Sequence, residues 1–235
     1  RGGGSAGDTA RGGGPPGRVS GRNTAVTLRR AGPLAPLAEK GVAALAMGRD
    51  MGSEDFALSF ANSGDDVDAM REIIGADARL ISKIESRRGI RNLEDIAARS
   101  DALLIDRGDL SREIPIEGIP GAQKSIIERG RKAGRPVYVA TNLLESMVSS
   151  PQPTRAEVND IFNTLADGAD GLVLAAETAI GDYPVECANL LVKMIHAFGQ
   201  TSHPALSYYH GDPKSLRSQP PGPPLAPSGP TAAPR

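Results

Sequence analysis

Short apolar runs alternate along the middle of the chain with segments whose apolar residues recur at helical spacing. Each run is four or five residues long and is followed by a turn, which is the pattern of a buried strand. The runs are Phe56–Phe60, Leu80–Ile84, Ala102–Ile105, Val137–Ala140 and Leu172–Ala175. Strands and helices that alternate in this way predict a parallel sheet covered by helices.

Several helix ends carry residues with strong positional preferences. Thr154 is followed three residues later by Glu157, a capping-box pattern that predicts the start of a helix. Gly168 can end that helix, and Gly134 with Pro136 ends the helix before the fourth apolar run.

Polar residues follow several of the runs at the point where each strand would end. They are Lys83 and Glu85, Arg107 to Asp109, Thr141, and Glu177. A (β/α) barrel collects its active site at the C-terminal ends of its strands, whereas an open doubly wound sheet usually shows a Gly-rich phosphate turn after its first strand. The RGGG repeats at Arg1 and Arg11 follow no strand and do not form such a turn. We therefore predict an α/β fold, a partial TIM-type (β/α) barrel with about five parallel strands.

The two ends of the chain differ in composition from the middle. Residues 1–22 are rich in Gly and Arg, and residues 201–235 are rich in Pro, so neither offers enough apolar side chains to form a core. We predict that both are disordered and that the barrel domain covers residues 23–200.

Composition excludes some classes of partner. The net charge of −1 gives no global attraction to nucleic acid or to an anionic membrane, and no apolar run approaches the roughly 20 residues of a membrane span. The chain begins at Arg1 and lacks the pattern of a targeting leader. We expect a cytoplasmic protein, and we interpret the sequence as a fragment.

Lys83 and Glu85 are two positions apart on one predicted strand, so their side chains point to the same side, roughly 7 Å apart along the strand. Such a pair at the end of a barrel strand forms a structural ion pair or binds a ligand. Asp109 follows the next strand, in a sharp turn, and with Glu85 could offer two carboxylates to Mg²⁺. Asp109 could instead cap a helical turn.

Several motifs occur together in one order, and as a set they are specific. They are SKIESRRGIRNLEDI (82–96), RGDLSREIP (107–115), VATNLLESM (139–147), PTRAEVND (153–160) and AETAIGDYP (176–184). This stretch closely resembles pyruvate kinase, in the C-terminal part of its catalytic barrel. The five runs correspond to the fourth through eighth strands of that family's barrel.

The resemblance implies a role for each matching residue. Lys83 matches the lysine beside the transferring phosphoryl group and the enolate oxygen, where a fixed cation stabilises developing charge. Glu85 and Asp109 match the two ligands of Mg²⁺ or Mn²⁺. Gly108 and Asp109 lie at the turn whose backbone N–H groups hold the substrate carboxylate, and Thr141 matches the threonine near the carbon that is protonated.

The resemblance also implies an activity and its partners. The family transfers a phosphoryl group from phosphoenolpyruvate to ADP in glycolysis, giving pyruvate and ATP, and the complete enzyme is expected to be a homo-oligomer that uses K⁺. We find no counterpart in this sequence for the K⁺ ligands, the first three strands or the nucleotide-covering domain.

Three positions depart from the family pattern. Ser111 stands where the family usually has Gly, and Asp106 stands where it has a small apolar residue. Ala175 replaces a serine that the family uses in proton delivery.

Two other functions remain open at this point. One is a non-catalytic barrel remnant or binding protein. The other is a different Mg²⁺-dependent barrel enzyme that acts on phosphoenolpyruvate or pyruvate through an enolate. The intact RGDL, SKIE and ETA motifs favour a kinase origin over the latter.

Overall fold

The fold is seen in a computed structural model that describes residues 39–201, all of which belong to one compact unit. The predicted disordered segment at residues 1–22 lies outside the described residues. So does the predicted tail, apart from Thr201, which ends the last helix.

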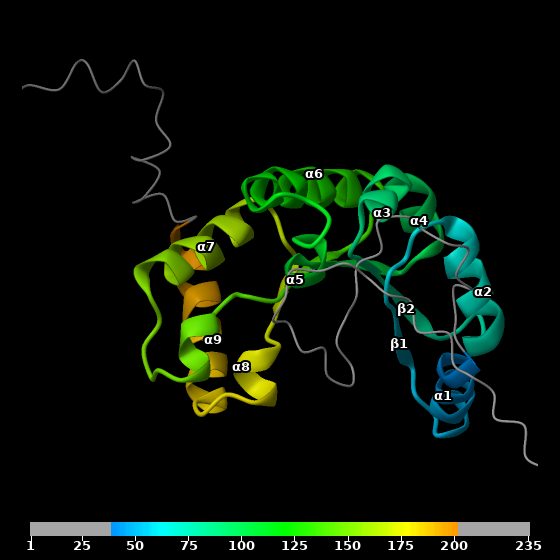
Figure 1. Cartoon of the computed structure of the whole chain (residues 1–235), viewed down its shortest axis with the longest axis horizontal. Helices are drawn as coiled ribbons and strands as arrows, with labels where there is room; N and C mark the ends of the chain where they lie inside the picture. The colour runs from blue at the N-terminus through cyan, green and yellow to red at the C-terminus, as the bar shows by residue number, and fades with distance from the viewer. Residues whose placement is uncertain (1–38, 202–235) are drawn as a thin grey trace, which may run out of the picture. The chain divides into compact units, whose positions relative to one another are not determined.

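Strands and helices alternate along the described residues (Figure 1). The strands are β1 (Asp55–Leu58), β2 (Arg79–Ile84), β3 (Ala102–Asp106), β4 (Val137–Ala140) and β5 (Gly171–Val173). The helices are α1 (Glu39–Asp50), α2 (Gly64–Ile74), α3 (Arg87–Arg91), α4 (Leu93–Arg99), α5 (Arg107–Leu110), α6 (Ile119–Lys132), α7 (Arg155–Ala166), α8 (Ala176–Ala179) and α9 (Pro184–Thr201). Two 3₁₀ turns, η1 (Ile116–Gly118) and η2 (Glu145–Val148), interrupt the connections.

The five strands form one sheet in the order β1-β2-β3-β4-β5, and every neighbouring pair is parallel. Strands that are adjacent in sequence are therefore adjacent in space, which is the connectivity of a (β/α) barrel. Within residues 39–201 the sheet does not close, because β1 and β5 are its two edges. The predicted partial barrel with five parallel strands is confirmed.

Alternation along β2 separates the two faces of the sheet. Leu80, Ser82 and Ile84 are fully buried, whereas Ile81 and Lys83 are half-buried on the opposite face. Figure 1 shows α2, α4 and α6 following one another along one side of the strands. Lys83 thus lies on the face that becomes the interior of a barrel.

Apolar side chains form two buried clusters. The larger joins β1 to β4 with α2, α4 and α6, and its fully buried members include Val67, Leu80, Ile96, Leu103 and Ile126. The smaller joins the segment after β4 to α7 and α9, and consists of Leu143, Leu144, Met147, Ile161, Cys187 and Leu191. Leu172 of β5 packs against both clusters, so the two halves share one continuous core.

Helix and strand ends follow the predicted signals except at the first and fifth runs, whose strands end two residues early, at Leu58 and at Val173. Thr154 and Glu157 form the capping box of α7, and Gly134 and Gly168 adopt left-handed φ values of 71° and 98° just after α6 and α7. The first strand ends at Leu58 instead of Phe60, because Phe60 has φ 52°, which an extended strand cannot accommodate.

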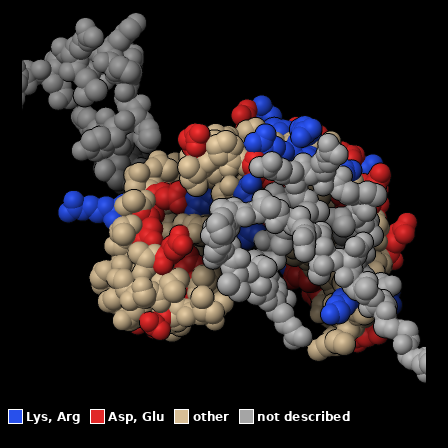
Figure 2. All heavy atoms as spheres, viewed as in Figure 1, with Lys and Arg blue, Asp and Glu red and all other residues tan. Residues whose placement is uncertain are grey.

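Charged side chains on the helical surface are largely paired. Figure 2 shows basic and acidic side chains interspersed along the edge that carries α6. Two of the ion pairs on this helix are Arg129 with Glu94, at 2.6 Å, and Lys132 with Glu128, at 2.6 Å. Within residues 39–201, no helix is both long and apolar enough to cross a membrane.

Candidate active site

Lys83 and Glu85 meet at the C-terminal end of β2. The Lys83 ammonium lies 2.6 Å from Glu85 Oε1, so the predicted pairing of the two side chains is present. The Glu85 side chain is only 1% exposed, and the Lys83 side chain is 22% exposed. A carboxylate this buried requires a nearby cation or hydrogen-bond donors.

A strained backbone conformation helps to hold Glu85. The backbone N–H of Phe60 donates to Glu85 Oε2 at 2.5 Å, and Phe60 has the left-handed φ of 52°. Strain of this kind persists where the surrounding structure determines it and is found at functional sites. The sequence alone did not reveal the contact, because it joins the ends of two strands 25 residues apart.

Asp106 is the second carboxylate that contacts Lys83. Asp106 Oδ2 lies 3.1 Å from the ammonium, and Asp106 Oδ1 accepts a hydrogen bond from the Asp109 N–H at 3.4 Å. The predicted sharp turn at 107–110 is therefore the short helix α5, and its N-cap is Asp106. The alternative in which Asp109 caps a helical turn is wrong, since Asp109 lies inside α5. Aspartate just before a helical turn is a known capping signal that could have identified Asp106.

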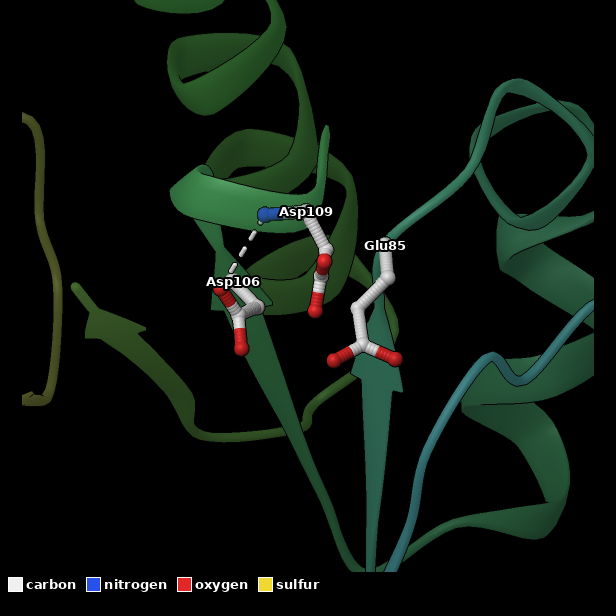
Figure 3. A group of neighbouring side chains, drawn as sticks. All are labelled: Glu85, Asp106 and Asp109. Atoms are coloured by element: carbon white, nitrogen blue, oxygen red, sulfur yellow. Dashed lines mark hydrogen bonds between the residues drawn. The ribbon is translucent and has the colours of Figure 1, made fainter. Parts of the chain in front are cut away.

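Three carboxylates converge between the ends of β2 and β3 (Figure 3). One oxygen each of Glu85, Asp106 and Asp109 lies within 4.8 Å of the others. Ligands of one Mg²⁺ lie about 2.1 Å from the ion and hence up to about 4.2 Å apart. Small side-chain movements would bring these oxygens into that range. The structure thus brings the predicted pair, Glu85 and Asp109, together and adds Asp106.

The donor set suits a hard divalent cation. Glu85 Oε1 is buried and accepts no hydrogen bond in good geometry, so its contact with Lys83 is ionic and leaves acceptor capacity unused. Carboxylate oxygens are the ligands that Mg²⁺ and Mn²⁺ prefer. The residues present therefore fit such an ion.

The protonation states of Lys83, Glu85 and Asp106 depend on one another. Burial alone would lower the pKa of Lys83, but its pairs with Glu85 and Asp106 outweigh burial and raise that pKa, so the ammonium stays protonated. Burial raises the pKa of Glu85 against the opposing effect of Lys83 and the Phe60 N–H. Burial would also raise the pKa of Asp106, but hydrogen bonding and charge attraction from Lys83 lower it overall.

Thr141 lies directly after β4 and faces α5. Its hydroxyl oxygen accepts a hydrogen bond from the Gly108 N–H at 2.8 Å. The same oxygen lies 2.7 Å from the Ala140 carbonyl oxygen and 3.2 Å from Asp106 Oδ1, and its single proton can serve only one of them at a time. The two backbone N–H groups expected to hold a substrate carboxylate, those of Gly108 and Asp109, thus have partners inside the protein.

Arg107, one of the polar residues predicted at the strand ends, has a structural role in this site that the sequence did not indicate. Its guanidinium is buried and donates to the Thr141 carbonyl oxygen at 2.9 and 3.1 Å and to the Asn142 carbonyl oxygen at 3.1 Å. It also pairs with Asp160 of α7 at 2.8 Å. No periodic signal predicts these contacts, because they depend on how far a long side chain reaches.

Two of the departures from the family pattern, Asp106 and Ser111, have side chains with a local structural role, whereas Ala175 contributes its backbone N–H. The Ser111 hydroxyl donates to the Gly108 carbonyl oxygen at 2.7 Å, at the end of α5. The Ala175 N–H donates to Glu177 Oε2 at 2.8 Å. Glu177 is 1% exposed and also accepts from the Leu144 N–H at 3.0 Å, so both of its oxygens hold backbone groups.

Comparison with known proteins agrees with this geometry. The family model described as pyruvate kinase, barrel domain, matches residues 17–188. The pyruvate kinase of Agrobacterium vitis is 44% identical over 170 residues, which cover 72% of this chain and 35% of the relative. The pyruvate kinase of Thermotoga maritima is 48% identical over 144 residues, 60% of this chain and 31% of the relative. Human pyruvate kinase PKLR is 41% identical over 180 residues, 75% of this chain and 30% of the relative.

The chain spans about a third of the length of these curated relatives. The matched region contains all five strands, and it ends within α9. On the strength of this match and of the parallel β/α connectivity, the chain belongs to the pyruvate kinase barrel-domain family.

Proposed function

We propose that this chain supplies part of a catalytic site that transfers the phosphoryl group of phosphoenolpyruvate to ADP. The observation that carries the proposal is the position of Lys83, a protonated ammonium between two buried carboxylates at the C-terminal ends of adjacent parallel strands. Active sites of barrel enzymes lie at this end of the sheet.

In the proposed reaction the bond between phosphorus and the enol oxygen breaks, and a β-phosphate oxygen of ADP takes the phosphoryl group. The electrons of the broken bond stay on the enolate oxygen of pyruvate. Lys83 would lie beside this oxygen and stabilise its charge. Its raised pKa keeps it cationic throughout, so it acts by position and charge.

Glu85 and Asp109 would hold Mg²⁺ or Mn²⁺, with Asp106 beside them. A bound divalent ion supplies neutralisation of the phosphoryl charge. Burial of Glu85 and its bond from the Phe60 N–H fix one carboxylate in place. K⁺ would serve the complete enzyme through ligands that we do not find in this sequence.

The substrate carboxylate would bind at α5. The N–H groups of Gly108 and Asp109 now donate to Thr141 and Asp106, so the substrate would take them over by exchange. Thr141 would then lie near the enolate carbon, where a proton must be added to form pyruvate.

The complete protein would act on phosphoenolpyruvate and ADP as a homo-oligomer in glycolysis. Phosphoryl transfer depends mainly on positioning of the reactants and neutralisation of their charge by the protein. The residues named here would supply both for phosphoenolpyruvate. The nucleotide side would require contributions from other parts of the complete enzyme.

Binding of phosphoenolpyruvate to the purified chain tests this proposal. We expect Mg²⁺-dependent binding, and we expect Lys83→Met to weaken it at least about tenfold, since removal of one charge-assisted contact costs about 1.5–3 kcal/mol. Lys132→Met is the matched control, because Lys132 is exposed on α6 and its one ion pair within residues 39–201 is with Glu128.

Equal affinity of wild type and Lys83→Met would contradict the proposal. It would favour the non-catalytic remnant. A third outcome combines two measurements. If Lys83→Met loses binding but the complete enzyme forms no ATP from ADP, the other enolate enzyme is favoured.

A further inference from the structure

The Asp106 carboxylate contacts hydrogen-bond donors from three parts of the fold, namely β2, α5 and the residue after β4. Its Oδ2 lies 3.1 Å from the Lys83 ammonium of β2. Its Oδ1 accepts from the Asp109 N–H of α5 at 3.4 Å and lies 3.2 Å from the Thr141 hydroxyl after β4. The side chain is 11% exposed, so water does little to weaken these contacts.

One of these donors, the Asp109 N–H, is a group that the incoming carboxylate would need, and the other two, Lys83 and Thr141, would lie beside the enolate oxygen and carbon of the same ligand. The Asp109 N–H has a single proton, and the Thr141 hydroxyl has a single proton that the Ala140 carbonyl oxygen also attracts. Lys83 has three protons and already faces both Glu85 and Asp106. While Asp106 holds this arrangement, phosphoenolpyruvate cannot take all three donors, and its carboxylate cannot take the Asp109 N–H.

Charge adds to this competition. Glu85 and Asp106 contact Lys83 and Asp109 lies beside these two carboxylates, so the four side chains carry two more negative than positive charges when ionised. A second carboxylate brought close to Asp106 would be repelled by it in a site that water screens poorly.

We infer that Asp106 is a built-in competitor for the carboxylate of phosphoenolpyruvate. The side chain occupies the Asp109 N–H of α5, beside Lys83 and Thr141, and it must leave before the substrate carboxylate can bind there. The inference rests on the proposed function and adds a residue that determines affinity for the carboxylate. It predicts a gain of affinity when Asp106 is removed, which loss of a merely structural contact does not give.

The test compares two ligands. Phosphoenolpyruvate and vinyl phosphate, which lacks the carboxylate, are titrated into wild type, Asp106→Ala and Asp106→Asn by calorimetry. Each titration is run at an Mg²⁺ concentration that saturates that variant. We expect Asp106→Ala to bind phosphoenolpyruvate about tenfold more tightly than wild type, equivalent to ~1.4 kcal/mol. Vinyl phosphate should gain clearly less, because it shares the contact with Lys83 but has no carboxylate to take the Asp109 N–H.

Two further variants serve as a control and as a substitute for Asp106→Ala. Asp68→Ala removes an exposed aspartate of α2 that pairs with Arg99, and it should leave both affinities unchanged. Asp106→Asn keeps the size and part of the hydrogen bonding of Asp106, so it is the second variant if Asp106→Ala does not fold. It should give a smaller gain in the same direction.

Three results would overturn the inference. They are unchanged or weaker binding of phosphoenolpyruvate by both Asp106 variants, an equal gain for vinyl phosphate, and no binding by any variant. The first two leave the proposed function intact as long as Lys83→Met weakens phosphoenolpyruvate binding as expected, whereas the third contradicts both the inference and the proposed function.

Discussion

Arg107 holds the left-handed end of β4, because its Nε and Nη2 both donate to the carbonyl oxygen of Thr141, at 3.1 and 2.9 Å. Thr141 and Asn142 have φ values of 68° and 55°, which L-residues other than Gly rarely adopt. The guanidinium also pairs with Asp160, so one side chain joins α5, the end of β4 and α7. The Thr141 hydroxyl is placed against α5 by this arrangement.

We expect Arg107→Lys to lower the free energy of unfolding by roughly 2 kcal/mol, because an ammonium cannot reproduce the planar fork of donors. Urea denaturation measures this change. Arg88→Lys on exposed α3 is the control and should shift the midpoint little. If Arg107→Lys unfolds at the same urea concentration as wild type, the fork does not stabilise the turn.

The capping box of α7 offers a second prediction. Thr154 Oγ1 accepts from the Glu157 N–H at 3.2 Å, and Glu157 Oε2 accepts from the Thr154 N–H at 2.7 Å. We expect Thr154→Ala to lower the free energy of unfolding by about 1 kcal/mol. Thr154→Ser retains the hydroxyl and should recover most of the loss, and a failure to recover would assign the effect to packing of the methyl group.

Stability should depend on pH through Glu157. Burial raises its pKa, but hydrogen bonds from Ser146 and Thr154 outweigh burial and lower it below the ordinary glutamate value. A depressed folded-state pKa contributes stability that is fully present above the unfolded value of about 4.3 and is lost as pH falls through the folded value. Glu157→Gln should therefore lose stability at neutral pH and converge with wild type in acid. If the free energies of unfolding of wild type and Glu157→Gln differ by the same amount at every pH, this linkage is excluded. Glu117→Gln serves as the control, because Glu117 is exposed.

Glu177 is a buried carboxylate with two backbone partners, the N–H groups of Leu144 and Ala175. We expect Glu177→Ala to lower the free energy of unfolding by roughly 2–4 kcal/mol, because two buried donors lose their acceptor. Glu177→Gln retains one acceptor oxygen and should be milder. Chemical denaturation that ranks Gln below Ala in stability would contradict this account.

The sequence predicted the fold where local signals and tertiary structure agree. Each of the five apolar runs overlaps one strand, with the ends of the first and fifth shifted by one or two residues, and the Thr154 cap and the glycines after α6 and α7 lie where they were expected. These features depend on periodicity and on the conformational preferences of single residues. The site at the strand ends followed from them, since parallel strands bring their C-terminal ends to one edge.

The contacts that shape the site could not be predicted in the same way. The Phe60 N–H reaches Glu85 across 25 positions, and Arg107 reaches Asp160 across 53. Such contacts depend on the reach of side chains and on left-handed backbone conformations that only the assembled fold determines. Asp106 was identified as a departure from the family, but its contact with Lys83 required the register of β2 with β3.

Divalent-ion affinity provides the last prediction. Glu85 and Asp109 are expected ligands, so Mn²⁺ titrated into the purified chain should bind, as measured by loss of the free-ion signal in electron paramagnetic resonance. We expect Asp109→Asn to weaken Mn²⁺ binding about tenfold or more. Loss of a residue that only supports a metal ligand already lowers metal affinity about 10–100-fold.

Asp109→Asn is the cleaner of the two ligand variants, because among the described residues Asp109 forms a single ion pair, with Arg112 at 3.3 Å, and its side chain is 28% exposed. Replacing it should leave the fold unchanged, which thermal unfolding verifies. Glu85→Gln also removes the stronger partner of Lys83, so it should weaken binding and alter stability together. Asp65→Asn on exposed α2 controls for general charge, because it removes one carboxylate without touching Lys83. Mn²⁺ affinity that is equal in wild type, Asp109→Asn and Asp65→Asn would mean that the converging carboxylates serve only as counter-ions of Lys83.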